Sequence, residues 1–511
     1  MQAAKTRRRQ AITVFWIVLI LEAAYGIYLS YGQGLLLGDA VSRTANAFYV
    51  LNVKPYRYAS MGLVWNPLPS TLQLPFIALA KLWRPIASEG IGAAIVTAFF
   101  AGWSAKIIYE TCLEFELSKS FTVIYTLLVA FHPYLFFYGA NGMSEAMSFS
   151  FTIRVMASLT LWIHDGSTRH LVRVALGNVG LFFTRYESIP FAIAVALCIS
   201  LFIMVSRREQ LFCNQGKASE RYFYIEGTLI LVFTPMAYAV LMWIFYNWII
   251  TGNPLYFLNS GYSMLAYSAY YSSHGGLLEV LAFLMARTWP FLIPVGVILL
   301  LRLFTGRLFR WDTLYFLACA LVLTAFQFYM LLQGTSAGYV RYMCYPLIIC
   351  VAWIPYEIRA SGIRLRKFMQ TALALTLLVS GVWFGWALQQ DEIFREDTLL
   401  MLPEGSQQMA DYINSNLSDR TILMDAYRAY DVYLHLDDVD TVKISSSLDF
   451  YQILEDPVVN GIQYILVPES SSYGDMDAVN IAYPKLYNEG VAWAQEVVHI
   501  GEFKLFKVLG A

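Results

Sequence analysis

The sequence predicts an α-helical polytopic membrane protein with about eleven transmembrane helices and a small C-terminal extracytoplasmic α/β domain. Of the 511 residues, 58% are hydrophobic and only 14% are charged, whereas soluble domains carry about 25% charged residues. Apolar runs of span length recur as far as residue 388. After Gln389, acidic and polar residues become more frequent. We therefore expect a transmembrane domain at 1–389 and the α/β domain at 390–511.

Each apolar run can cross a hydrocarbon core of about 30 Å if some helices are tilted or short. The first follows the basic segment Lys5–Arg9, and at about 20 residues it exceeds the 7–15 of a cleaved signal peptide, so we expect a retained helix. The Leu68–Trp83 segment is apolar but flanked by proline, and we expect a helix that lies on or dips into the outer interface. The expected spans are Ala11–Ser30, Ile91–Tyr109, Phe121–Phe137, Ala146–His164, Val174–Phe183, Ser188–Val205, Tyr222–Ile250, Leu278–Leu301, Thr313–Leu332, Met343–Tyr356 and Phe368–Leu388.

The distribution of basic residues predicts the orientation. Loops rich in Lys and Arg lie in the cytoplasm by the positive-inside rule. This places the N-terminus in the cytoplasm and, with an odd number of spans in a plasma membrane, the C-terminal domain outside. The short Val174–Phe183 span decides whether the number of spans is odd or even, and therefore on which side the C-terminal domain lies. The cations on the predicted inner face are Arg7–Arg9, Lys119, Arg169, Arg173, Arg207, Arg208, Lys217, Arg221, Arg302, Arg307, Arg310, Arg359, Arg364, Arg366 and Lys367.

In the tail, short β-like runs alternate with amphipathic helical stretches, which predicts a small α/β domain of about 120 residues. The runs are Thr421–Met424, Tyr464–Val467 and Phe503–Val508, and the helical stretches are Gln407–Leu417 and Ala426–Leu436.

Several classes of function are disfavoured. The formal net charge is −1, so nothing indicates nucleic acid binding. No pair of the six cysteines has zinc-ligand spacing. The chain has no glycine-rich P-loop, no His/Cys metal cluster and no nucleophile elbow. The long polar loops fall on the predicted outer side, so we expect the functional site there.

The first outer loop, 31–90, carries the most informative residue. Asp39 follows the first span closely, and a carboxylate beside the bilayer is costly unless it has a function. Arg43 lies one turn later on a helix that begins near Asp39, so a simple helix-stabilising pair is the alternative. The loop also supplies four candidate substrate-binding residues, Lys54, Arg57, Trp65 and Asn66.

Three further patches lie on the same predicted side, and each has a structural alternative. For the patch at the start of the fourth span, the structural alternative is a helix cap. For the patch between the fifth and sixth spans it is an internal ion pair, and for the patch beyond the ninth span it is anchoring at the membrane interface. Arg341, in the patch beyond the ninth span, is suited to bidentate contact with a phosphate. In chain order the candidates are Asn141 and Glu145, then Arg185, Tyr186 and Glu187, then Arg341 and Tyr342.

A carboxylate base, cations that can hold a phosphate and aromatic surfaces for a sugar and a lipid form a coherent set. At these residues the chain resembles the GT-C superfamily of integral membrane glycosyltransferases, in the style of the protein mannosyltransferase and aminoarabinose transferase branch. The resemblance covers the membrane region, from the Asp39 loop through Trp65-Asn66-Pro67-Leu68-Pro69 and Asn141–Glu145 to Arg341-Tyr342.

The resemblance implies a GT-C-like fold, a polyprenyl-phosphate sugar as donor, and inverting transfer to a hydroxyl of a protein, lipid or polysaccharide acceptor. It implies that Asp39 is the catalytic base, with Glu145 as the acid of the next outer loop. Arg341, with or without Arg185, would stabilise the leaving phosphate. Protein mannosyltransferases carry a second acid beside the first, where this chain has Ala40. We therefore expect no metal ligands and no cofactor, with a divalent metal as the less favoured alternative.

Two other classes of protein are alternatives. A transporter or lipid flippase could use Asp39, Arg185 and Glu187 as a polar pathway, but it would be expected to place ionisable residues near mid-membrane and to show repeat symmetry. A non-enzymatic scaffold would not explain the polar residues within the spans. We therefore expect an enzyme whose partners are a lipid-linked sugar, its acceptor and membrane lipids, and not nucleic acid.

Overall fold

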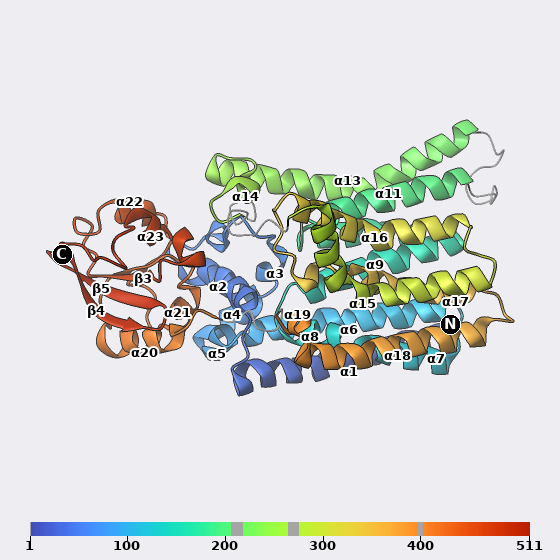
Figure 1. Cartoon of the computed structure of the whole chain (residues 1–511), viewed down its shortest axis with the longest axis horizontal. Coiled ribbons are helices and arrows are strands. Elements are labelled where there is room, and N and C mark those ends of the chain that lie inside the picture. The colour runs from blue at the N-terminus through green and yellow to red at the C-terminus, as the bar shows by residue number, and fades with distance from the viewer. Residues whose placement is uncertain (1, 206–217, 264–274, 397–401, 511) are drawn as a thin grey trace.

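The helices of the membrane region run along the long axis of the molecule, and a separate domain caps one end of them (Figure 1). The computed structural model describes residues 2–205, 218–263, 275–396 and 402–510. Arg207, Arg208 and Lys217, three of the predicted inner-face cations, lie outside these ranges. The N-terminus lies at the opposite end of the bundle from the C-terminal domain (Figure 1).

Nine helices within the described ranges are long and apolar enough to cross a membrane, and the bent pair α7 and α8 makes a tenth. This confirms an integral membrane protein. The nine are α1 (Gln2–Ile27, continued by a π-helical turn at Tyr28–Gly32), α6 (Ile91–Glu114), α9 (Glu145–Asp165), α11 (Ser188–Val205), α13 (Ala218–Thr251), α15 (Leu277–Phe304), α16 (Trp311–Leu332), α17 (Tyr345–Ala360) and α18 (Arg366–Gln390).

The remaining two predicted spans are irregular. The predicted Phe121–Phe137 span is broken into α7 (Lys119–Ala130) and α8 (Pro133–Ala140), which meet at 60°. The break precedes Pro133, since proline disfavours helical geometry in the residue before it. The predicted Val174–Phe183 span is α10 (Thr168–Phe182), which returns antiparallel to α9 and brings Arg185 back to Glu145. At 15 residues, α10 is not among the candidate spans, so the described ranges contain nine or ten candidates where the sequence predicts about eleven.

The first loop forms short helices at the end of the bundle that carries the C-terminal domain. They are α2 (Gly38–Asn52), α3 (Leu68–Thr71), α4 (Leu74–Ile77) and α5 (Pro85–Ser88), with 3₁₀ turns at Tyr58–Met61 and Ala78–Lys81. Each of α3, α4 and α5 has proline in its first two positions, where proline starts a helix but cannot continue one. The apolar Leu68–Trp83 segment is therefore not a span.

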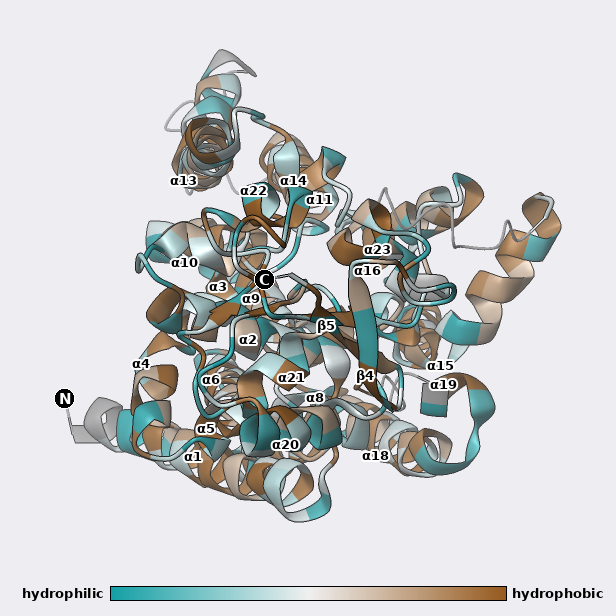
Figure 2. Ribbon diagram, turned by 90° about the vertical axis from the view of Figure 1, so that its left-hand side faces the viewer, coloured by the Kyte–Doolittle hydropathy of each residue, from teal (hydrophilic) through white to brown (hydrophobic). Residues whose placement is uncertain are grey.

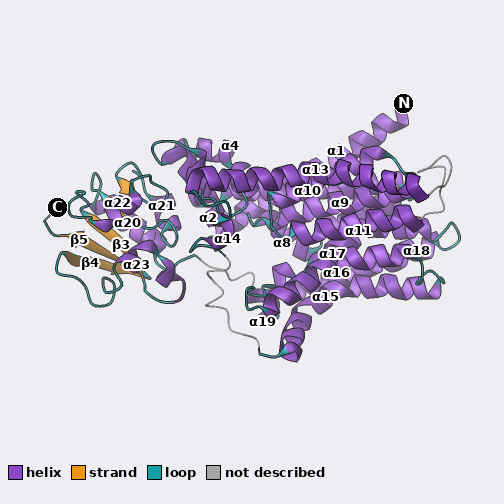
Figure 3. Ribbon diagram, turned by 90° about the horizontal axis from the view of Figure 1, so that it is seen from above, coloured by secondary structure: helices purple, strands orange, loops and turns teal. Residues whose placement is uncertain are grey.

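The C-terminal domain contains one mixed five-stranded sheet in the order β2-β1-β3-β5-β4. Strands β2, β1 and β3 are parallel, whereas β5 is antiparallel to both β3 and β4. Figure 3 shows these strands gathered at the end of the molecule that holds the C-terminus. The strands are β1 (Ile422–Leu423), β2 (Val442–Lys443), β3 (Tyr464–Pro468), β4 (Ala494–Ile500) and β5 (Phe503–Val508). The helices are α20 (Ser406–Asn416), α21 (Tyr430–His435), α22 (Phe450–Glu455) and α23 (Ala478–Ala482).

Polar contacts tie this domain to the first loop. Lys54 Nζ lies 2.7 Å from Asp440 Oδ2, and Arg57 Nη2 donates to the Ser446 carbonyl at 2.9 Å. In Figure 2, which looks onto this end of the molecule, α21 lies in front of α2. The first loop and the tail are therefore in direct contact although they are far apart in sequence.

A histidine at this contact makes its stability depend on pH. His435 Nε2 lies 3.6 Å from Glu89 Oε1, and its Nδ1 lies 3.5 Å from Asp431 Oδ1. Burial opposes protonation of His435, but the Glu89 and Asp431 carboxylates outweigh it and raise the pKa of His435 above its ordinary value. Burial also raises the pKa of Asp431 to about 6.

We predict that the docking of the C-terminal domain weakens as the pH rises. A group whose pKa is raised by folding contributes stability below its unfolded pKa and loses it as the pH passes its folded pKa. For His435 this window begins near its ordinary value of about 6.5 and extends upward. The His435→Gln variant should lose less thermal stability than wild type between about pH 6 and pH 8, because it lacks the titrating imidazole. Differential scanning fluorimetry in detergent measures the difference.

The His499→Gln variant is the control, because His499 lies on β4 beside Tyr487 and away from Glu89. It should keep the wild-type pH dependence. An unchanged pH dependence in His435→Gln would contradict the assignment.

Candidate active site

Asp39 lies in the first turn of α2 and forms an ion pair with Arg341. Arg341 Nη2 donates to Asp39 Oδ2 at 2.8 Å across 302 positions of sequence. Arg341 comes from the 3₁₀ turn Val340–Tyr342, just before α17, and its side chain is 4% exposed. The Asp39 side chain is 41% exposed. The pair therefore has a buried cation and a carboxylate that solvent or a substrate can reach.

Glu145 connects this pair to a second arginine. It lies in the first turn of α9 and is buried, and its Oε1 is 2.7 Å from Arg185 Nη1 and 3.4 Å from Arg341 Nε. Arg185 Nη2 is also 3.0 Å from Glu187 Oε1. Within the described chain, Glu145 Oε2 is buried without a hydrogen-bond partner. Five of the predicted site residues thus form one continuous network at the end of the bundle that carries the C-terminal domain.

The charges of the network stabilise one another. Burial alone would lower the pKa of Arg185, but Glu187 and Glu145 hold it well above its usual range. Burial likewise opposes ionisation of Glu187, and Arg185 nevertheless holds the pKa of Glu187 below its ordinary value. Both groups are therefore charged at neutral pH.

Arg43 is the exception in this group. Its guanidinium lies over the Trp65 ring, 4.4 Å from Cζ to the centroid, and it makes no ion pair with any described residue. In the same part of the chain, its Nη1 is buried without a hydrogen-bond partner. Burial lowers the pKa of Arg43 to about 10, although the nearby Asp39 and Glu145 act to raise it. The helix-stabilising pair with Asp39 that the spacing allows is thus not formed, because Asp39 binds Arg341.

Two other predicted residues, Tyr186 and Asn66, hold the backbone around Trp65 in place. The Tyr186 hydroxyl donates to the Val64 carbonyl at 3.0 Å and accepts from Trp243 Nε1 at 3.0 Å. Asn66 Nδ2 donates to the Phe182 carbonyl at 2.6 Å. Both contacts fix the backbone on either side of Trp65.

Two more predicted residues lie beside the arginines and α9. The Tyr342 ring is 5.0 Å from Arg185 Cζ. Asn141 Oδ1 accepts from the Met143 amide at 3.0 Å, while its Nδ2 is buried and unbonded within the residues that the structure describes.

Lys54 and Arg57 do not contact the Asp39 network. Both point to the C-terminal domain, through Asp440 and the Ser446 carbonyl. The sequence also does not single out Tyr430 of α21, whose pKa is raised by burial first and then by charges that include Asp39. No periodicity or motif could identify it, because its place in the apolar cluster shared with α2 follows from the docking of the two domains.

A second buried charge group lies at the opposite end of the bundle. Arg302 and Arg307, two of the predicted inner-face cations, are buried and bind Glu357 of α17, with Arg302 Nε and Arg307 Nη1 each 2.9 Å from a carboxylate oxygen. Asp312 of α16 lies 3.3 Å from Arg302 Nη1. This group joins α15, α16 and α17 and is separate from the Asp39 network.

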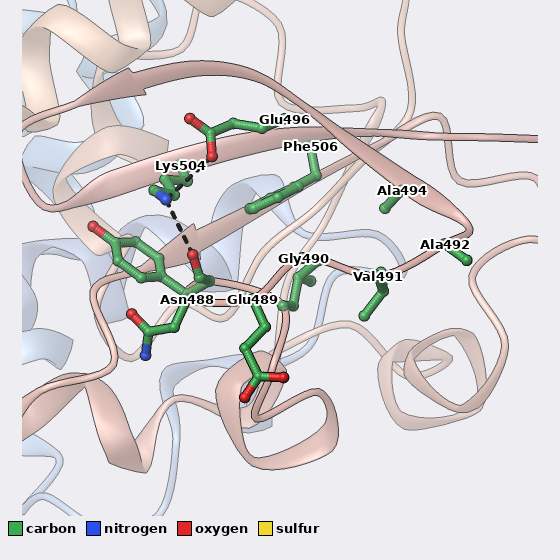
Figure 4. A pocket seen from close by; sticks show the side chains of 11 residues that line it. Asn488, Glu489, Gly490, Val491, Ala492, Ala494, Glu496, Lys504 and Phe506 are labelled. Atoms are coloured by element: carbon green, nitrogen blue, oxygen red, sulfur yellow. Dashed lines mark hydrogen bonds and ion pairs between the residues drawn. The ribbon is translucent and has the colours of Figure 1, made fainter.

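A cleft of about 420 Å³ lies on the C-terminal domain (Figure 4). Lys504 is the cation in its wall, and its Nζ already lies 3.1 Å from both Glu496 Oε2 and the Tyr487 carbonyl. None of the candidate residues lines this cleft. The Asp39 network is therefore the candidate active site.

Comparison with known proteins finds similarity in structure only. No protein-family model matches the chain, and a search of curated proteins finds no match. Among solved structures, ArnT from Cupriavidus metallidurans bound to undecaprenyl phosphate aligns over 97% of both chains with a TM-score of 0.57 and 11% identity. The same protein in the apo state aligns over 98% of this chain and 99% of its own, with a TM-score of 0.53 and 11% identity. The predicted GT-C fold is thereby confirmed.

Proposed function

We propose that the protein is a membrane glycosyltransferase that moves a sugar from a polyprenyl-phosphate donor to an acceptor hydroxyl, with inversion and without a metal ion. The observation that carries this proposal is the Asp39 network: a partly exposed carboxylate next to a buried and a largely buried arginine, at one end of a GT-C fold. The structural similarity to a protein whose structure contains undecaprenyl phosphate supports a donor of that chemical class.

Asp39 is suited to the role of general base. One oxygen, Oδ2, is held by Arg341, and the partial exposure of the side chain leaves room for an acceptor. The acceptor hydroxyl oxygen would attack the anomeric carbon from the face opposite the phosphate. As the new C–O bond forms, the bond to the phosphate oxygen breaks and its electron pair leaves with the polyprenyl phosphate. The hydroxyl proton passes to Asp39, and attack from the opposite face inverts the anomeric configuration.

Arg43 is suited to bind the donor phosphate. Arg185 and Arg341 already face Glu145, Glu187 and Asp39, so their charges are neutralised within the protein. Arg43 has only the Trp65 ring as a partner and a buried Nη1 without a hydrogen bond among the described residues. A phosphate oxygen would satisfy this nitrogen with a charge-assisted hydrogen bond. The charge on the phosphate grows as the sugar leaves, so a cation here favours the transition state.

We retain metal independence as part of the proposal. In the described ranges, no three His, Cys, Asp or Glu side chains are grouped as a metal site requires. The carboxylates of the network bind Arg185 and Arg341. Arg43, which makes no ion pair with a described residue, would supply the positive charge that a metal ion would bring to the phosphate.

We further propose that the network faces the outside of a plasma membrane, with the N-terminus in the cytoplasm. The basic residues of the opposite end support this orientation. A protein, a lipid or a polysaccharide fits equally as acceptor. The position of the network at one end of the bundle favours an enzyme over a transporter or flippase, in which the charged site is expected near mid-membrane.

Replacing Asp39 should abolish the chemical step. We predict that Asp39→Asn lowers the rate of sugar transfer by about 10²–10⁴-fold and leaves donor binding within about twofold, because Asn keeps the shape but cannot accept the proton. Transfer of radiolabelled sugar from a synthetic polyprenyl-phosphate donor measures the rate. Asp411→Asn, at an exposed position on α20, is the matched control. Wild-type transfer by folded Asp39→Asn protein would refute the assignment of the base.

Replacing Arg43 should act mainly on the donor. We predict that Arg43→Gln raises the KM for the donor by about tenfold or more, because it removes one charge-assisted hydrogen bond to the phosphate. Arg57→Gln changes the same residue type in the same loop, at a site that contacts Ser446 instead, and should leave the donor KM unchanged. Equal KM values for both variants would rule out Arg43 as the phosphate ligand.

Removing divalent metals should leave transfer intact. We predict that the rate in excess EDTA stays within about twofold of the untreated rate, because Arg43 supplies the phosphate-binding charge. The control is a known metal-dependent glycosyltransferase in the same buffer. A strong loss that Mn²⁺ or Mg²⁺ restores would show that the reaction requires a metal.

A further inference from the structure

The C-terminal domain shares its main apolar core with α2, the helix that carries Asp39. On α2, buried Val41, Ala45, Phe48 and Tyr49 belong to one continuous cluster with buried residues of the domain. The domain supplies residues from α20, α21 and four strands, among them Met409, Ile413, Ile422, Tyr430, Tyr433, Val442, Leu466, Phe503 and Leu505. Helix α2 is therefore part of the domain's core, although it belongs to the first loop by sequence.

Aromatic rings form the centre of this contact. The Tyr433 ring lies 5.4 Å from the Tyr49 ring and 6.0 Å from the Phe48 ring, with edge-to-face geometry in both pairs. Such pairs add specific geometry to the burial of apolar surface. The contact thus fixes the rotation of α2 about its axis as well as its distance from α21.

Arg84 connects the two helices directly. Its Nε donates to the Leu434 carbonyl at 2.8 Å, and its Nη2 donates to the carbonyls of Leu436 at 2.8 Å and Tyr433 at 3.3 Å. These carbonyls lie at the C-terminal end of α21, where a helix leaves backbone acceptors unpaired. The Tyr433 carbonyl also accepts from the Leu436 amide at 3.4 Å. The same guanidinium lies over the Phe48 ring of α2, 4.4 Å from Cζ to the centroid.

We propose that Arg84 is a positioning residue for Asp39, acting through α21 and α2, and that the C-terminal domain is thereby part of the catalytic apparatus. The proposal rests on the proposed function. Asp39 and Phe48 belong to one unbroken helix, so a shift of Phe48 moves Asp39 relative to Arg341. Displacing a catalytic group by about 1 Å can lower a rate by about a hundredfold.

The test compares Arg84→Gln and Arg84→Lys with Lys54→Gln in the full-length protein. Lys54 joins the same two parts of the chain through an ion pair with Asp440 whose side chains are 59% and 56% exposed, and such exposed pairs contribute little. The measurements are kcat and donor KM for transfer, and hydrogen exchange of the α2 amides at 38–52. We expect Arg84→Gln to lower kcat about tenfold. Donor KM should rise too, but less than in Arg43→Gln, because Arg43 lies on the same helix as Asp39.

Exchange in α2 should become faster in Arg84→Gln than in wild type, while exchange in the transmembrane helices stays the same. Arg84→Lys should recover part of the loss, because it restores a donor to the carbonyls, and Lys54→Gln should match wild type in both measurements. A wild-type kcat in Arg84→Gln would overturn the proposal, as would a parallel loss of stability throughout the bundle. If wild-type protein transferred no sugar, the proposed function would fail. Wild-type hydrogen exchange of α2 in Arg84→Gln would separately refute the link through Arg84.

Discussion

Glu145 is the residue on which the arrangement of the candidate active site depends. Its carboxylate lies between two guanidiniums, the buried one of Arg341 and the largely buried one of Arg185, whose side chain is 12% exposed. Removing one partner of a buried ion pair costs about 3–5 kcal/mol because the remaining charge has no solvent. The start of α9, the turn after α10 and the turn before α17 must therefore meet at one point. Asp39, which accepts a hydrogen bond from Arg341 Nη2, brings the first loop to the same point.

The sequence predicts the membrane part well because hydrophobic length is a local property. Ser188–Val205 is found with the predicted bounds, and Ile91 is the first residue of α6 as expected. The partners of the charged residues are not local. Arg43 stands one turn from Asp39, yet Arg341, 302 positions away, makes the ion pair. The residue types of the site can be predicted from sequence, but which residues form ion pairs depends on how distant segments of the chain pack together.

In the C-terminal domain, the prediction succeeds where strands are buried. The predicted runs at Tyr464–Val467 and Phe503–Val508 coincide with β3 and β5, whose residues are mostly buried. The edge strand β4 is mostly exposed and includes Gln495, Glu496 and His499, so it lacks the apolar pattern of a core strand. Lys54 and Arg57 resemble substrate-binding cations in sequence, and only the docking of the domain reveals their contacts with Asp440 and Ser446.

The core that α2 shares with the sheet also constrains how the protein can be made. Phe48 and Tyr49 lie near the start of the sequence, whereas Phe503 and Leu505, which belong to the same cluster, lie near its end. During synthesis, the apolar face of α2 therefore stays uncovered until β5 has emerged and folded. Exposed apolar surface of this kind is prone to aggregation and is what chaperones recognise. The first loop thus reaches its final form late, and an interrupted chain exposes a surface by which the cell can distinguish it from the finished protein.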